Sequence, residues 1–418
     1  MMIQKLRFAN TLILIFLAGC SSLAPILSTP TSAPAPAATS TLRPEPTATS
    51  SPAVTSTTLV IWLPPRFDPS AETESAELLD QRLREFEAEH SDLNIEVRIK
   101  SNPVEFLRVT TSAAPDSMPD LVVLSYNEMQ AAAAAGYLHP LDGLTEILQD
   151  PDWYVFARDL SSVQNAGYGI PFAANALLTV YRPAVFDTPP ATWDAIIGSG
   201  AKIVFPASDP NTYFPLSLYL SLGGQLADEQ GAFTLDETIL ARVLSFYQSA
   251  YEAEAIPVSS RVYQSDEQTL IGYRNGEADL AVVWASSDIA TVSGEYASLP
   301  GLEDVPHAIG NGWVWAFAGS DPEIQPLAVE LASYLVESDY MAEWTYAARY
   351  LPTRPLALEA WEGEALKSGI NDVLLSAHPA PSPETISRFG SLMQGALTRI
   401  FNGDQAEAVA RSVVESIE

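Results

Sequence analysis

Short apolar runs alternate with amphipathic segments from residue 59 to the end of the chain, and this alternation restricts the possible folds more than any other feature. The first run, 59–63, contains β-branched residues and has the length of a buried strand. Leu79, Leu83 and Phe86 then recur at helical spacing, and residues 93–99 alternate between apolar and polar positions, as half-buried strands do. The order of these segments predicts an α/β fold with a mostly parallel sheet.

The same pattern continues along the chain. We predict further strands at 121–124, 177–181, 203–205, 280–284 and 313–317. We predict further helices at 128–135, 215–222, 236–253, 265–276, 325–337, 339–347, 383–401 and 404–417. Ser265 and Gln268 have the spacing of a capping box at the start of one of these helices. With 418 residues, the chain has the length expected of two domains.

The first twenty residues have the organisation of an export signal. Lys5 and Arg7 precede the apolar run 11–17, which is too short to span a bilayer. The run ends in Leu17-Ala18-Gly19-Cys20, which resembles the bacterial lipobox, where a cysteine after small residues is lipidated. We therefore expect residues 1–19 to be a signal peptide and Cys20 to carry the lipid anchor. The alternative is an ordinary secretory signal followed by a structural cysteine.

A segment of low complexity separates this signal from the folded body. Ser, Thr, Pro and Ala dominate residues 21–58, in which only Arg43 and Glu45 are charged. Such a composition cannot build a core, so we predict that residues 20–58 form a lipidated cysteine followed by a disordered tether. No later apolar run reaches the roughly 18 residues of a transmembrane helix, so the expected membrane link is an anchor.

The composition argues against several functions. The chain has 52 Asp and Glu against 21 Lys and Arg, a net charge of −31, whereas nucleic-acid-binding surfaces are basic. One cysteine and four scattered histidines provide no metal or redox motif. The sequence also lacks a nucleophile elbow, an HExxH motif, a Walker A loop and a GxGxxG motif. We therefore expect no catalytic residues, cofactor, metal or nucleic-acid partner.

Several short motifs occur in a characteristic order between residues 59 and 418. They are Met118-Pro119-Asp120-Leu121-Val122, residues 136–142, Gly169-Ile170-Pro171, Ala191-Thr192-Trp193-Asp194, Gly223-Gly224, residues 273–278, Gly310-Asn311-Gly312-Trp313 and Leu351-Pro352-Thr353-Arg354. In order and spacing the chain resembles the family 1 extracellular solute-binding proteins, the lipoprotein receptors of ABC importers, and especially the sugar-binding members. Pro64-Pro65 and the short glycine-rich stretch before Trp313 depart from the family pattern.

The resemblance implies a type II periplasmic-binding-protein fold, in which two α/β lobes are joined by hinge segments and enclose a ligand cleft. It implies crossings between the lobes near 172–177 and 307–313. The expected lobes are 59–173 with about 285–345, and 174–284 with about 346–418. It also implies a monomeric extracytoplasmic receptor, lipid-anchored to the cell membrane at the cell surface or in the periplasm. Such a receptor captures a solute, here a sugar or oligosaccharide, by lobe closure and delivers it unchanged to an ABC permease.

Other functions remain open from the sequence. An acidic chain suits a cationic solute such as a polyamine, and an exported carbohydrate-active enzyme is a further alternative. A ferric-ion receptor could use Tyr346 and Tyr350, one helical turn apart, although the helix is predicted to break there. A purely structural surface lipoprotein would have no ligand cleft.

The candidates for a sugar site are aromatic and planar polar side chains at strand ends, at the two crossings, before the Gly223-Gly224 pair and before the Leu351-Pro352 turn. Aromatic rings stack on the C–H faces of sugars, and amide, carboxylate or guanidinium groups bond the hydroxyls. The candidates are Trp62, Arg66, Tyr126, Asn127, Asn175, Tyr213, Phe214, Trp284, Trp313, Trp315 and Tyr350. Trp313 and Trp315 should share one face of a strand. Each aromatic could instead be a core residue, which is our prediction for Trp153, Trp193, Trp344 and Trp361.

Overall fold

The computed structural model describes residues 57–289, 291, 293–303 and 305–417. The predicted signal peptide, Cys20 and the predicted tether up to residue 56 lie outside these residues. The described residues all belong to one compact unit. Every helix in the described part of the chain is too short or too polar to cross a membrane.

Nine strands form one large sheet. Its central path has the order β2-β1-β3-β10-β6-β8-β7, while β11 pairs with β10 and β9 pairs with β6. The strands are β1 (Thr57–Leu63), β2 (Leu93–Ile99), β3 (Leu121–Ser125), β6 (Gly169–Tyr181), β7 (Ile203–Val204), β8 (Leu280–Trp284), β9 (Glu295–Ala297), β10 (Ala308–Phe317) and β11 (Ala377–Pro379). A separate ribbon pairs β4 (Ser162–Val163) with β5 (Ala166–Gly167).

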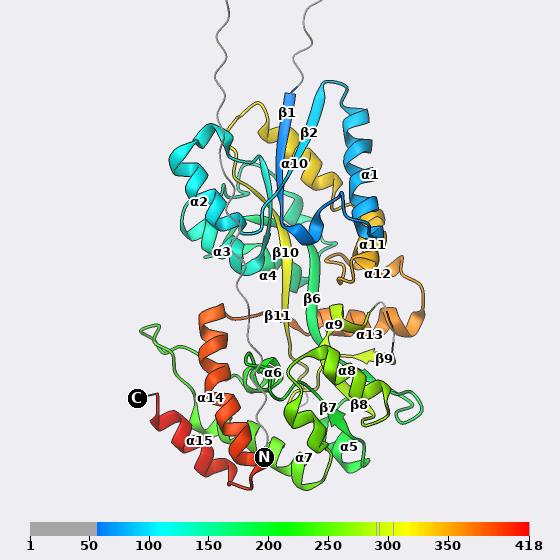
Figure 1. The fold of residues 1–418 in the computed structure, drawn as a ribbon, viewed down its shortest axis with the longest axis vertical. Helices are drawn as coiled ribbons and strands as arrows, with labels where there is room; N and C mark the ends of the chain where they lie inside the picture. Colours follow the sequence, from blue (N-terminus) through cyan, green and yellow to red (C-terminus); the bar gives the residue numbers. More distant parts are fainter. Residues whose placement is uncertain (1–56, 290, 292, 304, 418) are drawn as a thin grey trace, which may run out of the picture. The chain divides into compact units, whose positions relative to one another are not determined.

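Helices cover both faces of this sheet, as an α/β fold requires. They are α1 (Glu74–Glu89), α2 (Pro103–Ala113), α3 (Tyr126–Ala134), α4 (Val155–Leu160), α5 (Trp193–Gly198), α6 (Tyr213–Ser221), α7 (Glu237–Glu252), α8 (Asp266–Arg274), α9 (Ala285–Asp288), α10 (Gln325–Tyr334), α11 (Ser338–Ala347), α12 (Pro355–Glu359), α13 (Glu364–Leu375), α14 (Pro383–Phe401) and α15 (Ala406–Glu415). We call the part built on β1–β3 the first lobe and the part built on β7–β9 the second lobe. Figure 1 shows α1, α2, α3 and α10 around the first lobe and α5, α7, α14 and α15 around the second.

The prediction of a mostly parallel sheet is wrong for the strands at the centre of the sheet. Strand β1 pairs in parallel with β2 and β3, β7 with β8, and β10 with β11. By contrast, β10 is antiparallel to β3 and β6, and β6 is antiparallel to β8 and β9. The difference arises because β6 and β10 carry the chain between the two lobes in opposite directions.

Strands β6 and β10 run side by side from one lobe into the other (Figure 1). All 13 residues of β6 are buried, as expected of a central strand covered on both faces. The pairing places Trp313 opposite Ala173 and Asn311 opposite Asn175. Phe156 of α4 packs closely against β10 at Gly310, where a Cβ atom would lie 2.3 Å from the Phe156 ring. The two predicted crossings lie in these strands.

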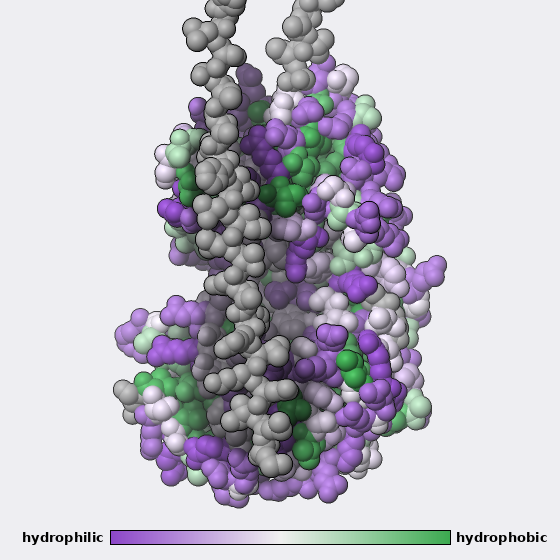
Figure 2. Space-filling model, in the orientation of Figure 1, coloured by the Kyte–Doolittle hydropathy of each residue, from purple (hydrophilic) through white to green (hydrophobic). Residues whose placement is uncertain are grey.

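The hydrophobic core has three clusters. One continues from one face of the first-lobe sheet into the second lobe, one lies on the other face of the first-lobe sheet, and the third lies in the second lobe. Ile61 and Trp315 lie on one face of the first-lobe sheet, and Trp62 and Val314 on the other. The second-lobe cluster gathers apolar residues of β8, α6, α7, α14 and α15. The tryptophans predicted to pack are all buried: Trp153, Trp193, Trp344 and Trp361. On the face shown in Figure 2, hydrophilic residues cover much of the surface and the hydrophobic patches are small.

Candidate functional site

Tyr213 and Trp284 meet in the second lobe, at the end of the strand β8. Trp284 is the last residue of β8, and Tyr213 is the first residue of α6. Their ring centroids are 5.0 Å apart and the ring planes are at 85°, an edge-to-face arrangement. Both side chains are half-buried. They line a cavity of about 20 Å³, which has room for one water-sized group.

Thr212 contributes an unpaired hydroxyl to the same cavity. Its backbone has φ 48°, a left-handed conformation that is rare for a β-branched residue. The residue is only 3% exposed, and its Oγ1 atom has no hydrogen-bond partner among the described residues. Strained backbone and unpaired buried hydroxyls are both costly, and strained residues cluster at functional sites.

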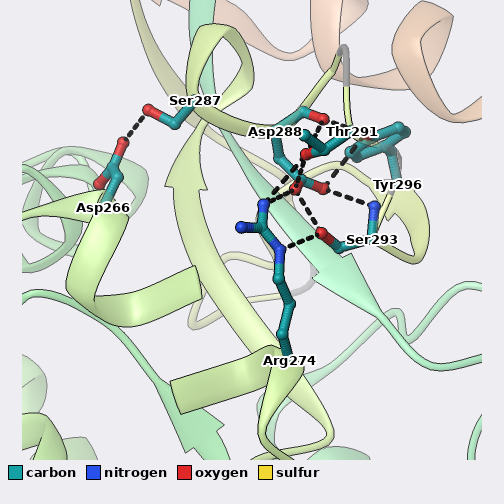
Figure 3. Close-up of polar contacts among 7 residues, drawn as sticks. All are labelled: Asp266, Arg274, Ser287, Asp288, Thr291, Ser293 and Tyr296. Atoms are coloured by element: carbon teal, nitrogen blue, oxygen red, sulfur yellow. Dashed lines mark hydrogen bonds and ion pairs between the residues drawn. The ribbon is translucent and has the colours of Figure 1, made fainter. Parts of the chain in front are cut away.

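Two aspartates complete the polar lining of the cavity. Oδ2 of Asp266 accepts a hydrogen bond of 2.9 Å from the backbone N–H of Trp284. The same oxygen accepts a bond of 2.7 Å from Oγ of Ser287 (Figure 3). Burial raises the pKa of Asp266 and also that of Asp209, and hydrogen bonds to each carboxylate oppose that rise. The lining includes no Lys or Arg. The cavity can therefore accept hydrogen bonds from hydroxyl or ammonium donors, and it offers nothing to an anion.

A second group of predicted site residues lies in the first lobe. Nη1 of Arg66 donates a hydrogen bond of 2.6 Å to the hydroxyl of Tyr350. The Arg66 guanidinium carbon also lies 5.1 Å from the centre of the Trp313 ring, which suits a cation–π contact. The Phe67 ring packs against Trp313 with centroids 5.0 Å apart. Arg66 is exposed, whereas Trp313 and Tyr350 are half-buried, so this group presents aromatic surface beside a fixed positive charge.

Tyr126 and Asn127 belong to the same region as Trp313. They begin α3, whose first turn is closed by a capping box between Ser125 and Glu128. Trp313 of β10 pairs with Ser125 of β3. Tyr126 and Asn127 directly follow Ser125 in the chain, so they begin beside Trp313. The Oδ1 atom of Asn127 is buried and has no hydrogen-bond partner among the described residues. Burial raises the pKa of the Tyr126 hydroxyl.

Asn175 lies between the two groups. Along β6, Ala173 pairs with Trp313 and Leu177 pairs with Trp284. At ~3.3 Å per residue, these two pairing positions are about 13 Å apart along the strand. The Asn175 side chain is 8% exposed, and both ends of its amide are bonded to Ser286.

Three predicted site residues lie in the hydrophobic core. Trp62, Phe214 and Trp315 are 2%, 3% and 3% exposed. Trp62 packs on the opposite face of the sheet from Trp315, while Trp313 and Trp315 belong to one cluster, as predicted from their spacing. The indole N–H groups of Trp62 and Trp315 have no acceptor among the described residues. Ligand contact by these three residues stays a prediction.

Sequence reasoning missed Asp209, Thr212, Asp266 and Ser286. A signal existed for Asp209, because it belongs to the loop after a predicted strand, where open α/β sheets bind ligands. Nothing in the sequence indicated the left-handed conformation of Thr212. In the described part of the chain, no group of three or more His, Cys, Asp or Glu residues is arranged to hold a metal ion.

Comparison with known proteins gives matches at the level of family and fold. The model of the family described as bacterial extracellular solute-binding protein matches residues 70–342, more than half of the chain. The maltose-bound MalE3 structure of T. maritima aligns with a TM-score of 0.62 at 20% identity, covering 86% of this chain and 98% of that chain. MalE of Xanthomonas citri aligns with a TM-score of 0.69 at 18% identity, covering 86% and 96%.

A curated relative matches a shorter stretch. The mannitol-binding protein of Pseudomonas aeruginosa is 32% identical over 109 residues, which are 26% of this chain. The match spans 25% of the length of that relative.

Proposed function

Because this chain belongs to the bacterial extracellular solute-binding protein family, we propose that it is a membrane-tethered receptor for a sugar or oligosaccharide. In this proposal the receptor traps the sugar by closing its two lobes and delivers it unchanged to an ABC permease. The observation that carries the sugar assignment is the Tyr213–Trp284 ring pair beside the carboxylates of Asp209 and Asp266.

The chemistry of this site suits a neutral sugar. A half-buried aromatic pair offers a ring surface to the C–H face of a pyranose, and carboxylates accept hydrogen bonds from its hydroxyls. The unpaired Thr212 hydroxyl can bond one further hydroxyl group. Similar proteins support this substrate class, since they include the maltose-bound MalE3, a cyclo/maltodextrin-binding protein in complex with maltotetraose, and the mannitol-binding protein.

The long strands β6 and β10 supply the connection that lobe closure needs. They pair with each other across the junction of the lobes, so a change of twist there would move Trp313 and Trp284 relative to each other. A ligand that bonds both lobes stabilises the closed state by its additional contacts, which shifts the population toward it.

The experiment is a binding panel by isothermal titration calorimetry and intrinsic tryptophan fluorescence. The panel contains maltose, maltotetraose, mannitol, galacturonate and spermidine. We expect saturable binding of at least one neutral sugar, and galacturonate should be a poorer ligand than a neutral sugar, since the second-lobe cavity is lined by two carboxylates and no cation, even though Arg66 lies in the first-lobe group. Binding of spermidine alone would replace this proposal with that of a polyamine receptor. Release of nitrophenol from nitrophenyl glycosides would instead indicate an enzyme.

A further inference from the structure

The helix α9 is a single turn of four residues, Ala285–Asp288, and it directly follows Trp284. Helices this short are not stable on their own, so contacts with surrounding side chains must set its position. The structure shows such contacts at the start, the middle and the end of this turn. All three use side-chain hydrogen bonds to elements distant in the sequence.

The start of α9 is held by Asp266. Its Oδ2 atom accepts hydrogen bonds from the Trp284 backbone and from the Ser287 hydroxyl. Figure 3 shows the Ser287 side chain on the side of α9 away from Asp288. One carboxylate oxygen therefore fixes both the backbone of the aromatic residue and the helix that follows it.

The end of α9 is held by Asp288, whose side chain is fully buried. Oδ1 accepts from Arg274 Nη2 at 3.0 Å, from Thr291 Oγ1 at 2.8 Å and from Ser293 Oγ at 2.6 Å (Figure 3). Oδ2 accepts from the Ser293 backbone at 3.1 Å and from Tyr296 Oη at 3.3 Å. Burial alone would raise the pKa of Asp288, but these hydrogen bonds outweigh it and hold the pKa below its ordinary value.

One helix, α8, contributes to both ends. Asp266 is the first residue of α8 and Arg274 is its last, so the two side chains start about 12 Å apart along α8 and reach the start and the end of the shorter α9. The N-terminus of α8 is capped by the Ser265 side chain, which accepts from the backbone of Gln268 as predicted. The Gln268 side chain bonds the backbone of Gln264 instead of Ser265, so only half of the predicted capping box forms.

The middle of α9 is joined to the crossing strand β6. Nδ2 of Asn175 donates to Oγ of Ser286 at 2.9 Å, and the Ser286 backbone N–H donates to Oδ1 of Asn175 at 3.1 Å. Asn175 lies opposite Asn311 of β10, where the two long strands pass between the lobes. This reciprocal pair therefore ties the segment after Trp284 to the strand pair that connects the lobes.

We propose that α8 and α9 together form a brace, residues 266–288, that couples the position of Trp284 to the crossing strand β6. Ser286 and Asn175 are its positioning residues, and Asp266 and Asp288 hold its ends. When the strand pair changes its twist on lobe closure, Asn175 moves α9 and therefore moves Trp284 with it. The consequence for ligand affinity rests on the proposed sugar-binding function.

The test uses the full chain with Cys20→Ser, Glu89→Cys and Glu407→Cys, so that a pair of fluorophores reports the distance between the lobes by single-molecule energy transfer. Ser286→Ala removes one hydrogen bond of the reciprocal pair, and Asn175→Ala removes both. Ser286→Thr keeps the hydroxyl. Ser333→Ala is the matched control, because it removes a half-buried hydroxyl whose 2.8 Å bond to Val329 lies on α10 in the first lobe.

We expect Ser286→Ala and Asn175→Ala to broaden the distribution of distances between the lobes without ligand. We also expect them to weaken maltotetraose binding about tenfold, the loss that one or two hydrogen bonds give. Ser286→Thr and Ser333→Ala should match the unsubstituted chain in both measurements. An unchanged ligand-free distribution in Asn175→Ala would overturn the brace, whether or not a sugar binds. Absence of sugar binding in the unsubstituted chain would overturn only the proposed function.

Discussion

The rings of Tyr213 and Trp284 meet almost at right angles, with their centroids 5.0 Å apart. Each ring limits the rotamers of the other, and both keep part of their surface accessible. Trp284 is further fixed by the hydrogen bond from its backbone to Asp266. A preorganised aromatic surface of this kind loses little conformational entropy when a ligand binds.

Replacing Trp284 should therefore reduce affinity more than it reduces stability. For Trp284→Ala we expect maltotetraose binding to weaken tenfold or more, since contact with an aromatic ring contributes roughly 1.5–3 kcal/mol. Trp284→Phe should retain most of the affinity, because a ring remains opposite Tyr213. Calorimetric titration gives both affinities, and thermal unfolding checks the fold. Equal affinities for Trp284→Ala and the unsubstituted chain would place the ligand elsewhere.

Asp266 should make the folded protein less stable as the pH rises. Its pKa is raised by burial, so between the ordinary Asp pKa and the raised value the native state holds more protons than the unfolded state. The free energy of unfolding then falls as pH increases through that window. Asp266→Asn keeps an acceptor oxygen but cannot ionise, so its stability should depend less on pH as the pH rises above the ordinary Asp pKa of about 3.9. Urea unfolding at several pH values measures this difference, and Asp68→Asn, an aspartate in the first lobe, is the control.

Elements with a continuous or regular apolar pattern were predicted well from the sequence. The bounds of β2, β8 and α14 agree with the predictions residue for residue. Their patterns reflect burial of one helical stripe or of a whole strand, which is a local property of the chain.

Elements that depend on partners were missed or shortened. Only residues 177–181 of β6 were predicted, because residues 169–176 are mostly glycine, alanine and proline, which have low strand propensity. That part is a strand because β10 pairs with it. Strand β11 has only three residues and shows no periodicity. The helix α13 was missed although Ile370, Val373 and Leu374 form an apolar stripe.

The candidate site was predicted in part for the same reason. Trp284 was predicted because it ends a strand, and Tyr213 was predicted from its place about ten residues before Gly223-Gly224, which the family resemblance indicates. Ligand contact by both stays a prediction. The left-handed Thr212 and the bonds that Asp266 makes to Trp284 and Ser287 arise only when distant segments meet. Asn175 was predicted as a ligand contact, and the structure shows its amide bonded to Ser286.

Replacing Cys20 should release the protein from the membrane, if the predicted lipidation occurs. Cys20 is the only cysteine in the sequence, so a palmitate label on the chain can be assigned to it. For Cys20→Ser we expect no label and full recovery in the aqueous phase of a detergent partition. Ser21→Ala should behave as the unsubstituted chain. Label retained on Cys20→Ser would contradict the predicted anchor.

Asp288 should contribute far more to stability than an exposed aspartate in an ion pair. Asp288→Ala removes the carboxylate that accepts from the Arg274 guanidinium and the Ser293 hydroxyl, and we expect a loss of about 2–4 kcal/mol. The hydroxyls of Thr291 and Tyr296 lose one acceptor each but keep the backbone oxygen of residue 288. Asp404→Ala breaks only an exposed pair with Arg399 and should cost about 0–1 kcal/mol. Chemical unfolding of both variants measures the difference. Similar losses would show that the buried network adds nothing to stability.

His307 should make the protein sensitive to mild acid. Its ring stacks on His378 with centroids 4.4 Å apart, and its Nε2 atom has no partner among the described residues. Burial, with the neighbouring His378, lowers the pKa of His307 to about 4. The unfolded state therefore binds the proton more tightly than the folded state does. The contribution of neutral His307 to the free energy of unfolding is complete above the ordinary histidine pKa of about 6.5, and it is lost as pH falls toward 4, by at most ~3 kcal/mol.

The test compares His307→Phe with the unsubstituted chain between pH 7.5 and pH 4.5. Phenylalanine can keep the stack on His378 but cannot take up a proton, so its melting temperature should fall less on acidification. His139→Gln, a change at a histidine outside this stack, should retain the pH dependence of the unsubstituted chain. If His307→Phe loses stability with acid as steeply as the unsubstituted chain does, the acid sensitivity originates in other groups. His307 directly precedes β10 and His378 lies in β11, which pairs with β10, so the stacked rings lie beside one of the two strands that join the lobes.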